Sequence, residues 1–85
     1  MNETGNGPTL IAALLAFNTE AVLYCQGISD IVAQEYAVSY ARMILARVKG
    51  QEYSLPRYPL SMFAPNRNLI QSTLERMSKK HFPQP

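Results

Sequence analysis

The sequence predicts an all-α fold of three helices with a short, strand-like, proline-rich arm, arranged as a two-fold dimer. Residues 28–50 have the spacing of one long helix and are apolar around almost the whole circumference, so this helix must be buried on nearly every side. The chain has only 85 residues, and chains this short are marginally stable without a disulfide, a metal or oligomerisation. With one cysteine and one histidine, a second copy of the chain is the remaining source of stability.

The first predicted helix covers residues 10–26. Pro8 and Thr9 offer a start, and Gly27 is placed to end the helix in the left-handed conformation that glycine adopts easily. Its apolar residues form one broad stripe that we expect to face the core: Leu10, Ile11, Leu14, Leu15, Phe17, Ala21, Val22, Tyr24 and Cys25.

The central helix follows after a very short joint. Ser29 is a suitable N-cap, Asp30 lies near the positive end of the helix dipole, and Gly50 is placed to end the helix as Gly27 ends the first. Two apolar helices joined so closely must form a corner or a hairpin.

Residues 51–65 change character because three prolines, at positions 56, 59 and 65, exclude a helix. We expect a short strand over 51–55, which needs its copy in a second subunit as a partner. Asn66 then begins the last helix. Residues 9–80 form a single helical domain in this prediction, with tails at 1–8 and 81–85.

Charge is unevenly distributed along the chain. Residues 1–41 contain four acidic and no basic side chains, whereas residues 42–85 contain all eight Lys and Arg against two acidic side chains. This asymmetry is typical of contact with nucleic acid or an acidic partner, and equally of a dimer in which opposite halves face each other.

Several functional classes find no support in the pattern. Cys25 and His81 lie far apart in the sequence, the histidine in a predicted tail, and there is no phosphate-binding glycine loop. We therefore expect no enzyme, cofactor, metal or small-molecule substrate. Residues 10–25 fall short of the roughly 20 apolar residues of a membrane span, so we expect no membrane contact. A single thiol suits a cytoplasmic protein.

Two registers of a helix-turn-helix motif fit the spacing of residues 23–43. Base edges in DNA are read by polar side chains such as Arg, Asn and Gln. One register would expose the apolar positions Tyr40, Ala41, Ile44 and Leu45, and the other would turn the carboxylates of Asp30 and Glu35 toward phosphates. Both registers therefore fail, and an uninterrupted buried helix is the better interpretation.

The basic second half supplies the candidate binding residues. Basic side chains that bracket aromatic ones can grip a phosphate backbone and stack on bases, although the same aromatics could belong to a core and the charges could serve solubility. The candidate nucleic-acid-binding residues are Arg47, Lys49, Arg57, Arg67, Arg76, Lys79 and Lys80. The candidate dimer or partner interface comprises Tyr36, Tyr40, Met43, Ile44, Val48, Tyr53, Leu55, Tyr58 and Phe63.

Residues 41–80 resemble the dimerisation region of Mor-type phage middle-operon transcription activators. In that family a hydrophobic helix ends in glycine, a short Gly-Gln-x-Tyr-x-Pro-Lys/Arg strand follows, and the next helix opens near an Arg-Asn or Arg-Asp pair. The corresponding residues are Gly50, Gln51, Tyr53, Pro56, Arg57, Arg67, Asn68 and Ile70. One residue is inserted before Pro56, Lys49 replaces a glycine, and the family's C-terminal helix-turn-helix has no counterpart after Lys80.

This resemblance implies an intertwined dimer whose strands pair across the two-fold axis, without the DNA-reading domain. We therefore expect a small dimeric regulatory protein of phage or mobile-element type. It would contact DNA or the transcription machinery through its basic half. The alternative is a protein-interaction module, an inhibitor or adaptor, that binds another regulatory protein through its apolar helices and its Tyr/Phe-rich arm without contacting nucleic acid.

Overall fold

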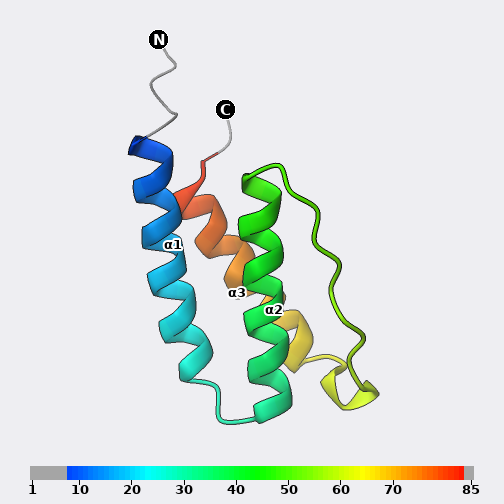
Figure 1. Ribbon diagram of the computed structural model, residues 1–85. Helices are drawn as coiled ribbons and strands as arrows, with labels where there is room; N and C mark the ends of the chain where they lie inside the picture. Colours follow the sequence, from blue (N-terminus) through cyan, green and yellow to red (C-terminus); the bar gives the residue numbers. More distant parts are fainter. Residues whose placement is uncertain (1–7, 84–85) are drawn as a thin grey trace.

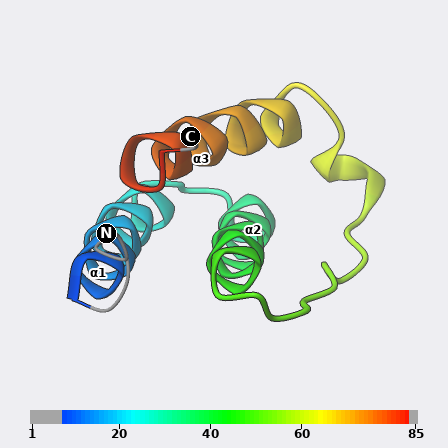
Figure 2. The same ribbon diagram turned by 90° about the horizontal axis from the view of Figure 1, so that it is seen from above.

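The computed structural model describes residues 8–83 and contains three α-helices within that range. Helices α1 (Pro8–Gln26) and α2 (Ile31–Val48) form an antiparallel hairpin, and α3 (Asn66–His81) crosses one side of both (Figures 1 and 2). A short 3₁₀ helix, η2 (Leu60–Met62), precedes α3. The all-α prediction is confirmed for these residues, in which the helices pack pairwise against one another.

The predicted strand over residues 51–55 is wrong, because residues 8–83 contain no strand. The segment from 49 to 65, here the connecting segment, is instead attached to α2 by side chains. The Tyr58 hydroxyl lies 2.6 Å from Ser39 Oγ and 3.3 Å from the carbonyl oxygen of Glu35. Met62 is buried, whereas Leu60 and Phe63 are exposed. Without a neighbouring strand the backbone of 51–55 has no ladder to join.

The ends of α2 correct one expectation and confirm another. Asp30, rather than Ser29, is the N-cap: its Oδ1 accepts hydrogen bonds from the backbone N–H groups of Val32, at 2.9 Å, and Ala33, at 3.3 Å. At the other end Gly50 has the expected left-handed backbone, with φ of 74°. Its N–H donates to the Arg47 carbonyl, and the N–H of Gln51 donates to the Ala46 carbonyl, which is a Schellman motif.

Two other predicted boundaries also change. Helix α1 begins at Pro8, which is favoured in a first helical turn because its nitrogen has no hydrogen to leave unpaired. Gly27 does not adopt a positive φ, because the chain leaves α1 through a right-handed turn in which its N–H bonds to carbonyls of the last helical turn. Residues 1–7 and 84–85 of the predicted tails lie outside the described residues.

The remainder of the C-terminal tail prediction is wrong. His81 is the last residue of α3, and Phe82 follows it directly. Both rings pack against Phe17 of α1, with centroid separations of 6.2 Å for His81 and 5.4 Å for Phe82. These contacts bury apolar ring surface and fasten the end of α3 to the first helix.

The core lies where α3 crosses the hairpin. Its largest fully buried side chains come from every helix and from the connecting segment: Phe17, Tyr36, Ile44, Met62 and Leu74. Four of the seven buried residues of α2 are alanines, which allow neighbouring helices to approach closely. The apolar surface of the central helix, from which the sequence predicted a second copy, is thus largely covered within one chain.

The Asp30 cap can be tested by mutation. Removing an N-cap side chain leaves backbone N–H groups without a partner, and we expect Asp30→Ala to reduce the free energy of unfolding by about 1 kcal/mol. Urea unfolding followed by circular dichroism measures the change. Ser29→Ala is the matched control and should change stability by less than about 0.5 kcal/mol; equal losses in the two variants would contradict this assignment of the cap.

Candidate functional site

The predicted interface residues divide by burial. Tyr36, Tyr40 and Ile44 are buried inside the protomer's own core, so their surface is covered without a partner. Met43, Val48, Leu55 and Tyr58 are half-buried. Tyr53 and Phe63 are exposed, and Phe63 retains 63% of its accessible surface. Only the last two therefore offer a large contact surface outside the chain.

Arg67, one of the predicted nucleic-acid-binding residues, belongs to the cluster around Tyr36. Its guanidinium carbon lies 5.6 Å from the centre of the Tyr36 ring, a cation–π arrangement. On another side the Tyr58 ring meets Tyr36 edge-on at 5.1 Å. Gln71 Nε2 donates a hydrogen bond to the Tyr36 hydroxyl. Arg67 thus joins α3 to α2 rather than projecting freely.

Arg47 likewise has a structural neighbour. Glu75 Oε2 accepts a hydrogen bond of 2.9 Å from the Tyr40 hydroxyl and lies 3.7 Å from Arg47 Nη1. Burial, together with the hydrogen bond to the Glu75 carboxylate, raises the pKa of Tyr40 to about 12. Tyr40 therefore stays protonated at neutral pH and holds the carboxylate of α3 beside α2.

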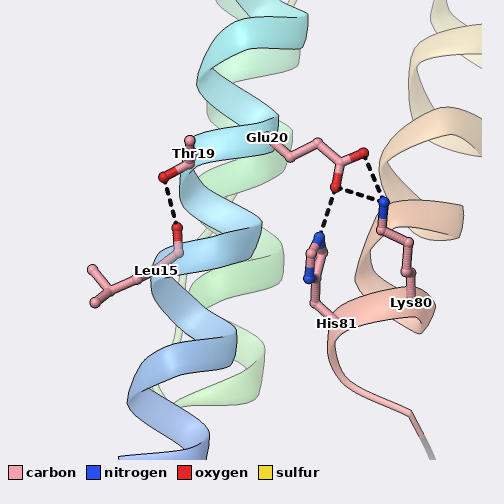
Figure 3. A network of polar contacts seen from close by, with 5 residues as sticks. All are labelled: Leu15, Thr19, Glu20, Lys80 and His81. Atoms are coloured by element: carbon pink, nitrogen blue, oxygen red, sulfur yellow. Dashed lines mark hydrogen bonds and ion pairs between the residues drawn. The ribbon is translucent and has the colours of Figure 1, made fainter.

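Lys80 and His81 share one carboxylate of α1 (Figure 3). Glu20 Oε1 lies 2.6 Å from His81 Nε2 and 3.1 Å from Lys80 Nζ. The hydrogen bonds with His81 and Lys80 lower the pKa of Glu20 below its ordinary value of 4.5. No local sequence pattern indicated this pairing, because the partners lie 60 and 61 residues apart.

The exposed side of α3 is the basic surface that remains. Ile70, Leu74 and Met77 face the core, so the opposite side of the helix carries Asn68, Ser72, Arg76 and Lys79, all exposed. Arg76 and Lys79 have no carboxylate within ion-pair distance among residues 8–83. We call these four residues, with the adjacent Lys80, the basic face of α3.

The other predicted basic residues lie elsewhere. Lys49 caps the C-terminus of α2. Arg57 lines a shallow hollow with Glu35, Val38 and Arg42 on the side of α2 beside the connecting segment. The seven residues predicted to bind nucleic acid therefore do not form one surface, and Arg42, which the prediction omitted, is exposed.

A second surface covers the side of the hairpin opposite α3. Sequence periodicity placed Ile11, Leu15 and Val22 on the core-facing stripe of α1, but they are 57%, 63% and 44% exposed. Helix α1 buries only Phe17, Ala21 and Cys25, one residue per turn. Beside Val22 a groove of about 280 Å³ separates α1 from α2. We call this side of the molecule the open face.

Comparison with known proteins adds no assignment: no protein-family model, curated protein or solved structure matches this chain.

The described residues contain few groups suited to nucleophilic or metal chemistry. Cys25 is buried, and burial raises the pKa of its thiol, which disfavours the reactive thiolate. Within residues 8–83, no group of three or more His, Cys, Asp or Glu side chains could hold a metal ion. Residues Thr9–Gln26 could cross a membrane by length and composition alone, a test that core helices of soluble proteins also pass. The absence of membrane contact stays a prediction.

The Glu20 contact predicts a pH-dependent stability. Because the folded-state pKa of Glu20 is lowered, its contribution is present above about pH 4.5 and is lost as the pH falls through the lowered value. We expect Glu20→Gln to lower the thermal unfolding midpoint at pH 7, and the difference from the wild type to shrink as the pH falls below about 4.5. Thermal unfolding by circular dichroism checks this, with the exposed Glu52→Gln as control. A difference that persists unchanged at pH 3 would contradict the assignment.

Proposed function

We propose that the protein is a small dimeric regulatory protein that contacts DNA through the basic face of α3. The observation that supports this proposal is the composition of that face, where arginine, lysine and asparagine side chains project from one exposed side of a helix. An α-helix fits the major groove, where Arg and Lys pair with guanine and Asn pairs with adenine. The only carboxylate of α3, Glu75, is held by Tyr40 and Arg47.

The position of α3 supports the same proposal. It forms the outer layer of the molecule and crosses the hairpin on one side only (Figure 2). Its outer side is therefore free of other helices within residues 8–83. Glu75 and Tyr36 account for Arg47 and Arg67, and Lys80 pairs with Glu20. Among the basic residues, the proposal therefore rests on Arg76 and Lys79.

A second candidate function is that of a protein-interaction module, as an inhibitor or adaptor. The observation that favours it is the open face, where Ile11, Leu15 and Val22 are exposed on a helix whose only charged residue is Glu20. Contiguous exposed apolar surface is typical of protein–protein contact. Binding of this kind is driven by apolar burial and depends little on salt.

Salt dependence separates the two candidates. Each phosphate neutralised by the protein releases counterions, so affinity for DNA falls steeply as salt rises. We expect a fluorescently labelled, mixed-sequence duplex to bind at low salt and to lose affinity between two salt concentrations, as measured by anisotropy. No binding at low salt would overturn the DNA-contact proposal.

A matched pair of variants locates the contact. Arg76→Ala removes one charge from the basic face of α3, and we expect it to reduce the slope of log affinity against log salt by about 1. Arg57→Ala removes the same charge from the other side of α2 and should change the slope less. Equal effects of the two substitutions would show that α3 is not the contact surface.

A further inference from the structure

The groove on the open face has apolar side chains on both walls. Val22 of α1 and Val38 and Leu45 of α2 line the groove between the two helices. Figure 1 looks onto this side of the hairpin, with α3 behind it. Helix α2 is covered by α1, by α3 and, at Tyr58, by the connecting segment. Its half-buried Val38 side faces outward, next to the exposed apolar side of α1.

The residues of α2 on the open face are arranged symmetrically about Val38. Seven positions before it lies Ile31, which is 68% exposed, and seven positions after it lies Leu45. Glu35 comes three positions before Val38, and Arg42 comes four positions after it. Residues three, four and seven apart share one side of a helix, so this side reads apolar, acidic, apolar, basic, apolar.

Such a stripe is complementary to its own reversed copy. If two α2 helices lie antiparallel and cross at Val38, Ile31 of one meets Leu45 of the other. Glu35 of each copy likewise meets Arg42 of the other copy, which gives two pairs of opposite charge. A parallel arrangement would instead place Arg42 beside its own copy, which like-charge repulsion disfavours.

Helix α1 shows the same kind of symmetry about Val22, the residue across the groove from Val38. Val22 and Val38 line the groove from opposite sides. Four positions before Val22 lies Asn18 and four positions after it lies Gln26, and both of these amides also line the groove. In an antiparallel copy Asn18 would face Gln26, and an amide can both donate and accept a hydrogen bond.

We propose that a second copy of this chain covers the open face, with the two-fold axis passing beside Val38 and Val22 perpendicular to both helices. This inference rests on the dimer of the proposed function and assigns its contact surface. An isologous interface requires a patch that complements itself, and a binding site for a foreign protein has no reason to be symmetric. The two hairpins then pack face to face as a four-helix bundle. The two α3 helices lie on the outer sides of this bundle.

The position of the axis can be tested by a single cysteine. At the axis, Val38→Cys places two thiols close enough for a disulfide, which needs Cα atoms about 4.4–6.8 Å apart. We expect this variant to form a covalent dimer under mild oxidation. Arg42→Cys is the matched control. Position 42 lies four residues from Val38, so in two antiparallel helices its Cα and that of its copy are about 12 Å apart along the helix axes. The wild-type chain, whose Cys25 is buried, is the blank.

Charge exchange tests the two Glu35–Arg42 pairs that the antiparallel arrangement predicts. Arg42→Glu places carboxylates beside Glu35 of the other copy, and we expect the dimer dissociation constant to rise about tenfold in sedimentation equilibrium. The double variant Glu35→Arg with Arg42→Glu restores opposite charges and should recover most of the affinity. Both positions are exposed in the protomer, so folding is not at risk.

The outcomes separate this inference from the function on which it rests. A wild-type chain that is monomeric at micromolar concentration overturns both the dimer and its surface, and leaves the open face to a different protein. A dimeric wild type in which Val38→Cys fails to cross-link, or in which the charge exchange fails to restore affinity, overturns only the surface. DNA binding by α3 is measured independently of all three results.

Discussion

The burial of Tyr36 is the interaction on which the arrangement of this protein depends. Its ring is fully buried at the place where α2, α3 and the connecting segment meet. Tyr58 packs edge-on against it, Arg67 stacks over it, and Gln71 donates a hydrogen bond to its hydroxyl. A buried phenol left without a partner costs free energy, so the Gln71 bond favours one rotational setting of α3. That setting turns the basic face of α3 outward.

The short length of the chain is the second constraint. After the α1–α2 hairpin, the chain has only one more helix, α3, and α3 covers one side of the hairpin. The other side keeps apolar residues such as Leu15 and Val22 in contact with solvent. The molecule therefore has two chemically different faces, one basic and polar, the other mostly apolar. Such a protein can associate through one face while it binds a charged ligand with the other.

Sequence periodicity was informative about the helices and much less so about the surfaces. It placed all three helices to within a few residues and identified the Gly50 cap, because these features depend on residues close in the chain. It did not distinguish the buried line of α1 from its exposed apolar side, because both are apolar at helical spacing. The contacts of Glu20 with His81 and of Tyr40 with Glu75 join distant residues, which no local pattern reveals.

The sequence by itself determined the all-helical class, the uninterrupted central helix and the concentration of basic residues in the second half. Local hydrogen bonding and the spacing of apolar side chains are sufficient for these. Only the tertiary structure decided which side of each helix is covered. Because α3 folds back over one side of the hairpin, Tyr36 and Ile44 are buried within the chain, whereas Val38 and Arg42 lie on the open face. The same crossing decides that Arg67 lies half-buried over the Tyr36 ring while Arg76 projects outward.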